Sequence, residues 1–415
     1  MKSLELKYGN GRISLKLGEA NVLSILSAKK SPPLSDPVGT IKKVLKYPIS
    51  SVGFYETFVP GEKVAIVVSD RTRNIAASVF LPALINELNS IGIPDKEIFI
   101  VFACGTHRLH TKAEHIKIVG EDIGGRIALF DHDCTDKNNL ITLGTTSRGT
   151  RVEVNKKVAE ADRIILTGAV TYHYFAGYGG GRKAVLPGIS AFETIQNNHK
   201  LCLTSDKATT GVLAGNPVHE DMVEAAKMLD PDLILNVIID DSGRISSVFA
   251  GDLVAAHEAA CEALDKRFKI KAGKRSKFVI ASAGGGSKDL NFVQSHKAME
   301  NASYVLEDGG TMVLMGESRE GFPSGEYMKY VNLGSAKAIE EELLRTFSIP
   351  GHTILSAFKK AERFKIILVS KLNKDAVSKF GIIPAKDMAE AMNLAGDVGP
   401  AYVIPDAYNV FPVAD

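Results

Sequence analysis

Residues 164–199 read IILTGAVTYHYFAGYGGGRKAVLPGISAFETIQNNH, and other parts of the chain repeat the pattern of this stretch. Its first residues are apolar and of strand length, whereas its final part fits a helix. The segment between them is polar and rich in glycine. A buried strand, a polar loop and a helix in this order form the repeating unit of an α/β fold with a parallel sheet.

The loop of this unit holds a glycine cluster (Gly177 and 179–181) directly before Arg182 and Lys183. Glycine allows another group to approach the backbone closely. The sequence offers no packing requirement that explains so many glycines, so we expect a ligand to approach the backbone here. The spacing departs from both the P-loop and the dinucleotide-binding fingerprint. Lys183 could either bond covalently to a carbonyl-type cofactor or pair with a phosphate.

The length of 415 residues is too great for one ordinary hydrophobic core and predicts two domains. We expect a first α/β domain over residues 1–268, with a β-hairpin near its start. A basic, glycine-containing linker over 269–276 leads to a second α/β domain over 277–404. The tail, residues 405–415, could return to the first domain.

The composition is that of a globular protein, with 45% hydrophobic and 24% charged residues. A formal net charge of +2 gives no reason to expect a nucleic-acid or membrane partner. The longest apolar runs are strand-length, and the N-terminus lacks the apolar core of a signal peptide. The 4 cysteines are widely spaced without a CxxC pair, which indicates a reducing, cytoplasmic location.

Polar residues repeatedly follow apolar strands. The strand KVAIVVS precedes residues 70–73, EIFIVFA precedes His107, and FVIASA in the second domain precedes the loop that leads to residues 294–297. The fold class is therefore α/β, with two domains and mainly parallel sheets. Ligands of such sheets bind beyond the carboxyl ends of the strands. Because one of these loops belongs to the second domain, we expect the active site in the interdomain cleft.

These loops allow a functional and a structural interpretation. Asp70, Arg71, Thr72 and Arg73 could clamp a phosphate or carboxylate, or form a helix cap with solvated arginines. His107 could act as a general base or as a structural hydrogen-bonding group. The segment Asp131–Cys134 offers metal-ligating side chains but fits a turn as well.

Three more positions remain open in the same way. His199 lies on a helix, where a histidine is usually packed, and becomes a metal ligand only if a metal is suspected. Gln294 and Lys297 share a helix face and could hold a carboxylate and a hydroxyl, whereas His296 points elsewhere. Cys104 could be a nucleophile, but it has no clear partner in the sequence.

In this order and at these separations, DRTR (70–73), GTHR (105–108), the segment from YHYFAGYGGGRKAVLPGI to NNH (172–199) and QSHKA (294–298) resemble the nickel-pincer-dependent lactate racemase family. The resemblance covers most of the chain. It implies a two-domain α/β enzyme whose cofactor is a nickel pincer nucleotide, Ni(II)-pyridinium-3,5-bisthiocarboxylic acid mononucleotide. The middle segment is highly specific, whereas DRTR and GTHR would be weak alone.

The resemblance also implies a role for each matching residue. Lys183 would carry the cofactor covalently through a thioamide, and His199 would complete the coordination of nickel. His107 and His173 would be the two acid/base residues. The cofactor-contacting loop would be Asp70, Arg71, Thr72 and Arg73, with Arg73 also near the substrate carboxylate. Gln294 and Lys297 would hold the substrate, and Val293 lies where pocket residues tune substrate size and polarity.

The implied reaction inverts C2 of a 2-hydroxy acid, lactate or a related acid, through a 2-keto acid. The C2–H bond is a very weak acid because its carbanion would lie beside a carboxylate. Removal of hydride to the pyridinium ring, while a base takes the hydroxyl proton, avoids that dianion. The scheme needs one base for each enantiomer, which accounts for two histidines. It also requires cofactor-synthesis enzymes upstream as partners.

Two other functions fit parts of the same pattern. A metal-dependent hydrolase could use His107, His173 and His199 as ligands without modification of Lys183. A non-catalytic protein that binds anionic ligands could use residues 70–73 and the glycine loop, and it would tolerate His107→Ala.

Overall fold

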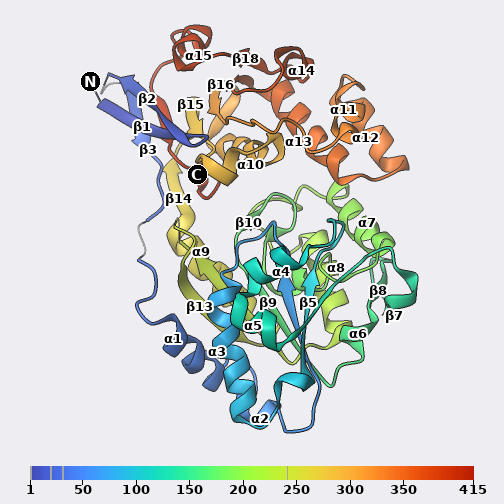
Figure 1. The fold of residues 1–415 in the computed structure, drawn as a ribbon. Coiled ribbons are helices and arrows are strands. Elements are labelled where there is room, and N and C mark those ends of the chain that lie inside the picture. The colour runs from blue at the N-terminus through green and yellow to red at the C-terminus, as the bar shows by residue number, and fades with distance from the viewer. Residues whose placement is uncertain (1, 19–20, 30–31, 241) are drawn as a thin grey trace. The chain divides into compact units, whose positions relative to one another are not determined.

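The computed structural model describes residues 2–18, 21–29, 32–240 and 242–415, and it divides into two compact units (Figure 1). Unit 1 comprises Met1–Lys29 and Lys266–Asp415, and unit 2 comprises Lys30–Asp265. Each unit contains a six-stranded sheet with helices around it. The expected α/β fold with mainly parallel sheets is confirmed.

The helices of unit 2 are α1 (Pro37–Lys46), α2 (Phe54–Thr57), α3 (Ala77–Ser90), α4 (Lys112–Val119), α5 (Glu121–Arg126), α6 (Lys156–Ala159), α7 (Phe192–Lys200) and α8 (Pro217–Leu229), and α9 (Ala255–Phe268) runs on into unit 1. Its strands are β4 (Val64–Ser69), β5 (Ile98–Ala103), β6 (Ala128–Asp131), β7 (Leu140–Thr145), β8 (Arg151–Asn155), β9 (Arg163–Ala169), β10 (Tyr172–His173), β11 (Gly177–Tyr178), β12 (Leu233–Ile239) and β13 (Ile245–Gly251). Short 3₁₀ turns are η2 (Asp95–Glu97), η3 (Lys137–Asn139), η4 (Gly181–Ala184) and η5 (Leu201–Leu203).

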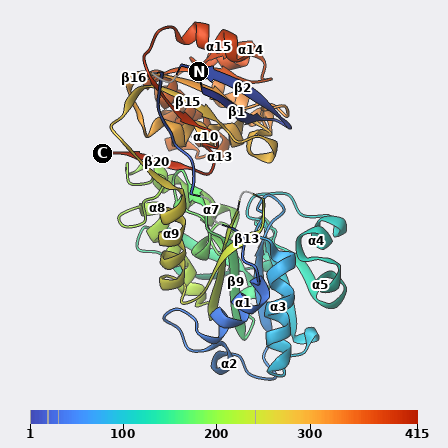
Figure 2. The ribbon, with the colours of Figure 1, turned by 90° about the vertical axis from the view of Figure 1, so that its left-hand side faces the viewer.

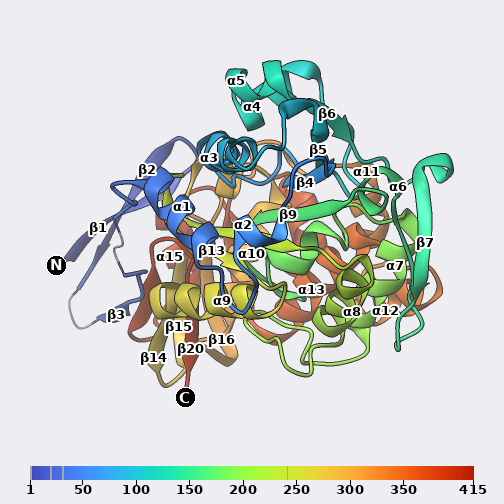
Figure 3. The same ribbon diagram turned by 90° about the horizontal axis from the view of Figure 1, so that it is seen from below.

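The large sheet of unit 2 has the strand order β13-β12-β9-β4-β5-β6 and is parallel except at β13. Alternate residues of β4 face opposite sides, so Val64 and Val68 join one hydrophobic core and Val67 joins the other. The first core contains residues of α3 and the second contains residues of α8, which lie on opposite sides of the sheet (Figure 3). Burial on both faces explains why these strands read as continuous apolar runs.

The strands of unit 1 are β1 (Lys2–Tyr8), β2 (Gly11–Leu17), β3 (Val22–Ile25), β14 (Lys269–Gly273), β15 (Ser276–Ser282), β16 (Leu306–Met315), β17 (Lys365–Val369), β18 (Ile383–Ala385), β19 (Ala401–Ile404) and β20 (Phe411–Ala414). Its helices are α10 (Phe292–Ser303), α11 (Gly325–Val331), α12 (Ala336–Arg345), α13 (Ile349–Arg363), α14 (Lys374–Lys379) and α15 (Met388–Ala395), and η6 (Gly286–Asp289) is a 3₁₀ turn.

The large sheet of unit 1 is parallel throughout, in the order β18-β17-β16-β15-β19-β3. The expected hairpin near the N-terminus is present as β1–β2, and Figures 1 and 2 show it beside β15. Its buried leucines, Leu6 and Leu15, share one core with Ile280 of β15 and Ala391 of α15. On the other side, α10 packs against β15 and β16.

The domain boundaries expected from the sequence need two corrections. The first domain is not continuous over 1–268, because β3 pairs with β19 and brings Met1–Lys29 into unit 1. The tail 405–415 does not return to the first domain, because β20 pairs with β14 inside unit 1. The expected linker 269–276 therefore contains a paired strand. An exposed strand edge is best satisfied by another strand, and both terminal segments supply one.

Among the helices of the described residues, none is both long enough and apolar enough to span a lipid bilayer.

Candidate active site

The polar loops of unit 2 meet at one edge of its sheet. Strands β9, β4 and β5 are parallel neighbours, so their carboxyl ends lie side by side. Asp70 follows β4, His107 lies in the loop after β5, and His173 follows β9. The sheet topology therefore gathers three of the residues singled out in the sequence on one edge.

Asp70 is buried and forms the centre of a tight turn. Its Oδ1 accepts hydrogen bonds from the backbone N–H and the hydroxyl of Thr72, at 3.2 and 2.7 Å, and its carbonyl accepts from the N–H of Arg73 at 3.0 Å. This is an Asx turn, in which a side chain replaces a backbone acceptor. The turn leaves the side chains of Arg71 and Arg73 exposed beyond the sheet edge.

The other carboxylate oxygen of Asp70 holds His107. Asp70 Oδ2 lies 2.6 Å from Nδ1 of His107. A carboxylate accepts a hydrogen bond, so Nδ1 of His107 carries the proton and a neutral ring has its lone pair on Nε2. The His107 side chain is 47% exposed, whereas that of Asp70 is 4% exposed. The His107 ring is thus half-exposed and is held in place by the buried carboxylate of Asp70.

Asp70 remains ionised in this arrangement. Burial alone would raise the pKa of its carboxyl, but the hydrogen bond and charge of His107, the hydroxyl of Thr72 and the charge of Arg73 outweigh burial and lower that pKa. The carboxylate is therefore available as an acceptor at neutral pH.

The His107 loop is also tied to the loop that carries Lys183. The N–H of Gly105 donates to the carbonyl of Gly188 at 2.9 Å, and the N–H of His107 donates to the carbonyl of Cys104 at 2.8 Å. Gly188 is packed so closely that a Cβ there would lie 2.1 Å from the carbonyl oxygen of Ala184. The bond from Gly105 to Gly188 links the two loops, and the other two contacts each hold one loop in shape.

The expectation that a ligand requires the glycine cluster is wrong. Gly177 has a φ of +76°, and a Cβ on it would lie 2.2 Å from the carbonyl oxygen of Val212. A Cβ on Gly180, which also has a φ of +76°, would lie 2.5 Å from Oδ1 of Asn236. Positive φ and close packing of the protein against itself account for both glycines. The cluster shapes the loop instead of making room for a ligand.

Arg182 is a structural residue of this loop. Its guanidinium is buried and donates to the carbonyls of Ala176, Tyr178, Gly179 and Gly180, at 2.8, 2.9, 3.3 and 3.2 Å. Burial lowers the pKa of Arg182 to about 10, which leaves it a cation at neutral pH. The charge is stabilised by carbonyl dipoles that all belong to the loop, so Arg182 holds the loop closed from inside.

The ring of Phe175 lies near three reactive side chains. Two of them, His173 and Lys183, belong to this loop, and His199 belongs to the following helix α7. The Phe175 ring centroid lies 4.5 Å from that of His173 and 5.1 Å from that of His199, and the Lys183 Nζ lies 5.7 Å from it. Phe175 itself is buried. The sequence did not single out this residue, although it stands in the most specific segment.

The ring nitrogens of His173 and His199 are oriented by neighbours. Nδ1 of His173 accepts from the backbone N–H of Ala176 at 3.3 Å. Nδ1 of His199 lies 3.1 Å from Oδ1 of Asn198 and donates to it, because an amide oxygen can only accept. The ring proton of His199 therefore lies on Nδ1, whereas that of a neutral His173 lies on Nε2.

Asn198 cannot turn its amide the other way. Its Nδ2 donates to the carbonyl of Val218 at 3.1 Å and to Oδ2 of Asp221 at 2.8 Å. Asn198 and Asp221 are both fully buried. A histidine whose Nδ1–H is held by an oxygen acceptor presents Nε2 with its lone pair, as metal-ligating histidines do. His199 therefore has the hydrogen-bonded support that is typical of a metal-ligating histidine.

In unit 1, Gln294 and Lys297 do share one face of α10 and contact each other. Lys297 Nζ lies 3.0 Å from Oε1 of Gln294 and 3.0 Å from the hydroxyl of Tyr408, which lies 3.3 Å from Gln294 Oε1. Asn301, one helical turn further on, bonds the carbonyl of Ala407 at 2.8 Å and so fixes the segment that carries Tyr408. Tyr408 completes the cluster and was missed in the sequence, where no motif marks it.

Other candidates prove to be structural. His296 is buried, bonds the hydroxyl of Ser356 at 3.0 Å, and has its pKa lowered to about 3 by burial. His132 is likewise buried and lies 2.9 Å from the carbonyl of Ser190, so the segment Asp131–Cys134 does not act as one ligand set. Burial and nearby carboxylates raise the pKa of the Cys104 thiol, which disfavours a nucleophilic thiolate.

Comparisons with known proteins cover nearly all of the chain. Family models of the lactate racemase N-terminal domain and C-terminal domain match residues 8–211 and 271–411. The lactate racemases of Lactiplantibacillus plantarum and Thermoanaerobacterium thermosaccharolyticum are 31% and 30% identical to this chain, each over 99% of both sequences.

Solved structures show the same relationship. The lactate racemase apoprotein from Thermoanaerobacterium thermosaccharolyticum superposes with a TM-score of 0.92 at 30% identity, covering 99% of this chain and 100% of that one. A Thermotoga maritima protein with 17% identity shares the fold at a TM-score of 0.70, covering 93% of this chain and 100% of its own. With full-length relatives at this level of identity, the chain belongs to the lactate racemase family.

Proposed function

We propose that the protein is a nickel-dependent racemase or epimerase that inverts C2 of a 2-hydroxy acid, with lactate as the first substrate to test. The observation that carries the proposal is the arrangement around the Phe175 ring. His173, Lys183 and His199 all contact it, and family resemblance gives them the roles of acid/base group, point of cofactor attachment and nickel ligand. Lactate racemase relatives over the full length support the same activity.

The residues fit a nickel pincer nucleotide. Lys183 offers an amine for a thioamide, and His199, whose Nδ1–H is held by Asn198, offers an imidazole donor. Nickel(II) would accept both sulfur and imidazole donors. The guanidinium groups of Arg71 and Arg73, on the Asp70 turn, are suited to the phosphate of a nucleotide. When held by these residues, such a cofactor would supply a hydride acceptor for the C2 hydrogen of the substrate.

The side chains of the protein supply the remaining steps. Nε2 of His107 accepts the hydroxyl proton of one enantiomer, while Asp70 stabilises the imidazolium that forms. His173 exchanges a proton with the substrate oxygen of the other enantiomer. The family resemblance assigns substrate binding to Arg73 of unit 2 and to Gln294 and Lys297 of unit 1. Residues with this role keep the planar 2-keto acid bound while it rotates. Positioned acid/base groups of this kind typically contribute ~10²–10⁴-fold each.

The first test is an intact-mass and nickel analysis of protein produced together with the cofactor-synthesis enzymes. We expect a covalent adduct on Lys183, about one nickel per chain, and racemisation of lactate. Protein produced without those enzymes should carry neither and be inactive. Lys183→Ala should lose the covalent adduct. An unmodified Lys183 without nickel under co-production would overturn the cofactor assignment.

The second test separates the two histidines from the cofactor. His107→Ala and His173→Ala should each keep the adduct and nickel but lose racemisation by ~10²-fold or more, as expected for loss of a positioned acid/base group. Retained racemisation in both variants would refute the two-base scheme. A panel of malate, longer aliphatic, aryl and sugar 2-hydroxy acids then identifies the preferred substrate.

A hydrolase with His107, His173 and His199 as metal ligands is less well supported. In the described part of the chain, the side chains that come within 4.8 Å of one another as a ligand group are Cys104, His110 and Asp131 instead. A protein that only binds anions does not need an imidazole that is oriented by a buried carboxylate, as His107 is by Asp70.

A further inference from the structure

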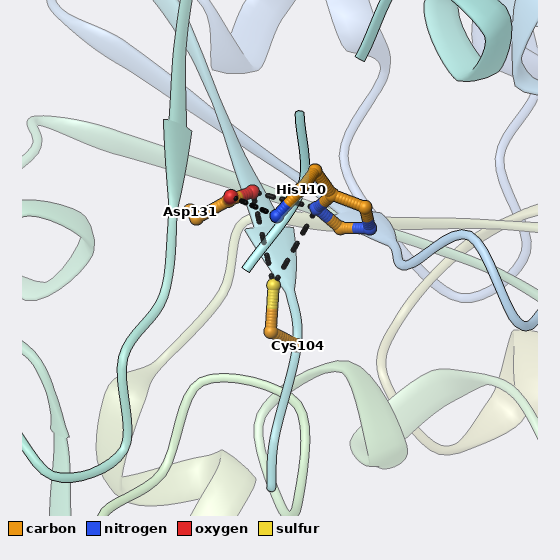
Figure 4. Close-up of side chains that lie close together, drawn as sticks. All are labelled: Cys104, His110 and Asp131. Carbon is orange, nitrogen blue, oxygen red and sulfur yellow. Dashed lines mark hydrogen bonds and ion pairs between the residues drawn. The ribbon is translucent and has the colours of Figure 1, made fainter. Parts of the chain in front are cut away.

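Four polar side chains come together beside the His107 loop, at the carboxyl ends of β5 and β6. Cys104, His110 and Asp131 are shown in Figure 4, and His115 of α4 reaches the same carboxylate. Cys104 and the His110 side chain are buried, and the side chains of His115 and Asp131 are 16% and 10% exposed. The cluster contains none of the residues assigned above to cofactor or substrate.

Asp131 accepts three hydrogen bonds from nitrogen atoms of His110 and His115. Its Oδ1 lies 2.7 Å from Nδ1 of His110 and 2.9 Å from Nε2 of His115, and its Oδ2 accepts from the backbone N–H of His110 at 2.6 Å. Burial would raise the pKa of the Asp131 carboxyl, but its bonds to both histidines lower it on balance. Asp131 is therefore an ionised acceptor that fixes both the ring and the backbone of His110.

The other nitrogen of the His110 ring faces the cofactor-contacting turn. The backbone N–H of Arg71 donates to Nε2 of His110 at 3.0 Å. Nε2 must carry a lone pair to accept this bond, so the proton of the ring lies on Nδ1, toward Asp131. Neither an imidazolium nor the opposite tautomer satisfies the Arg71 N–H, because both place a hydrogen on Nε2.

The same argument disfavours a metal in this cluster. A metal bound to Nδ1 of a neutral His110 would force the ring proton onto Nε2, where it would meet the Arg71 N–H. Burial and the neighbouring carboxylates also raise the pKa of the Cys104 thiol, whereas a metal ligand is a thiolate. The distances from Cys104 Sγ to His110 and Asp131, 3.7 and 3.8 Å, are those of weak thiol contacts.

We propose that His110 and Asp131 are positioning residues for the acid/base group His107. Asp131 fixes the tautomer of His110, His110 holds the backbone of Arg71, and this holds the turn in which Asp70 bonds His107. The kinetic part of the proposal rests on the proposed function, whereas the tautomer does not. A small displacement of a catalytic group can lower the rate ~10²-fold. A fixed His110 tautomer can therefore affect turnover through the position of His107.

The direct test is nitrogen NMR of histidine-labelled wild-type protein at neutral pH, without cofactor. We expect the His110 ring to carry its proton on Nδ1 and an unprotonated Nε2. Asp131→Asn keeps the shape of the side chain but replaces an acceptor by an NH₂ group, so we expect the His110 tautomer to shift. A wild-type ring with a proton on Nε2 would overturn the proposal, whether or not any variant folds.

The kinetic test uses cofactor-loaded protein and a matched control. Asp131→Asn should lower kcat by ~10-fold or more through misplacement of the His107 loop. His115→Phe also removes one bond to Asp131 and keeps the stacked ring on Phe102, 4.6 Å away, but has no link to Arg71. It should keep kcat within about twofold, because the tautomer of His110 is maintained.

The outcomes separate the hypotheses. If kcat decreased equally in Asp131→Asn and His115→Phe, the cluster would only stabilise the fold. That result would overturn the positioning role. Stoichiometric binding of Zn²⁺ that Cys104→Ser abolishes would replace it by a metal site. If loaded wild-type protein racemises no 2-hydroxy acid, the proposed function fails, and the tautomer measurement still decides this inference.

Discussion

Asp70 Oδ2 lies 2.6 Å from Nδ1 of His107, and this contact joins a buried carboxylate to a half-exposed imidazole. The carboxylate determines which ring nitrogen faces outward, and it also lowers its own pKa by accepting this bond. One pair of atoms therefore couples the acid/base chemistry proposed for the site to the acid stability of unit 2.

The pH dependence of stability should reveal this coupling. Because the pKa of Asp70 is lowered in the folded protein, its contribution to stability is complete above the unfolded value, ~3.9. It is lost as the pH falls through the folded pKa. We would measure the free energy of unfolding of unit 2 in urea from neutral pH down to a pH below the folded pKa of Asp70. This free energy should decrease less on acidification in Asp70→Asn than in wild type.

His107→Leu is the partner control for that prediction. It removes the hydrogen bond that lowers the Asp70 pKa while it leaves the carboxylate in place. The decrease in its free energy of unfolding at low pH should therefore be closer to that of Asp70→Asn than to that of wild type. Three identical pH profiles would show that the pair does not contribute to stability.

A second prediction concerns the buried chain Asp221–Asn198–His199. Asn198→Leu removes the acceptor for Nδ1–H of His199 at similar volume. Loss of such an outer partner typically weakens metal binding ~10–100-fold. We expect nickel to leave the loaded variant faster by this factor in the presence of a chelator, while the adduct mass on Lys183 persists.

Thr150→Val is the matched control for Asn198→Leu. It removes the hydroxyl that bonds Asp221 at 2.9 Å but leaves Asn198 in contact with His199. It should cost stability by ~1 kcal/mol and leave nickel release at the wild-type rate. Equal nickel release from both variants would mean that Asn198 only stabilises the fold.

Local patterns predicted the elements that local forces determine. The expected strands at 63–69, 97–103 and 278–283 correspond to β4, β5 and β15, because buried strands need apolar side chains on both faces. The pairing of β3 with β19 joins residues far apart in the sequence, and a periodicity in one segment says nothing about its partner. The domain boundaries were wrong for this reason.

The same distinction applies to the candidate site. The placement of His107 and Asp70 could be predicted because they follow strands that lie side by side, and that of Gln294 and Lys297 because they share a helix face. Phe175 could not, because its role depends on which side chains fold against it.

The glycine cluster was misinterpreted because a sequence shows permissive residues but not the atoms that crowd them. A Cβ on Gly177 would overlap the carbonyl of Val212, which follows it by many residues in the chain. The role of His110 could not be predicted either, because its bond to the N–H of Arg71 joins two loops that are apart in the sequence.

A third prediction tests Tyr408 in unit 1. Tyr408→Phe removes the hydroxyl that contacts both Lys297 and Gln294 while keeping the ring. If the pair holds the substrate, the loss of one hydrogen-bonding group of ~1 kcal/mol should raise KM about fivefold. We expect kcat to change less than KM.

Tyr402→Phe in the same unit provides the matched comparison. Its hydroxyl bonds the carbonyls of Ala272 and Lys274, at 2.5 and 2.9 Å, and does not contact Gln294 or Lys297 in the described hydrogen bonds. This variant should lower the stability of unit 1 and leave KM unchanged. A KM rise of the same size in both variants would argue against a substrate role for Tyr408.

The last prediction concerns the backbone of the glycine loop. Gly177 and Gly149 both have positive φ, +76° and +84°, but a Cβ on Gly149 would meet nothing within 4 Å, whereas one on Gly177 would overlap Val212. Gly149→Ala should cost ~1–2 kcal/mol for its left-handed backbone alone. Gly177→Ala should cost ~2 kcal/mol more, because overpacking adds to the same backbone strain.

A Cβ on Gly177 would push the carbonyl of Val212 away, and this movement connects the loop to the candidate site. Val212 O accepts from Nδ2 of Asn216, which also bonds the carbonyl of Phe175 at 2.9 Å. Movement of Val212 should therefore reach the ring that His173, Lys183 and His199 share. We expect Gly177→Ala, and not Gly149→Ala, to reduce the adduct on Lys183 in co-produced protein. Equal unfolding free energies of the two variants in urea, with equal adduct yields, would show that the loop tolerates a Cβ and that its shape does not depend on glycine.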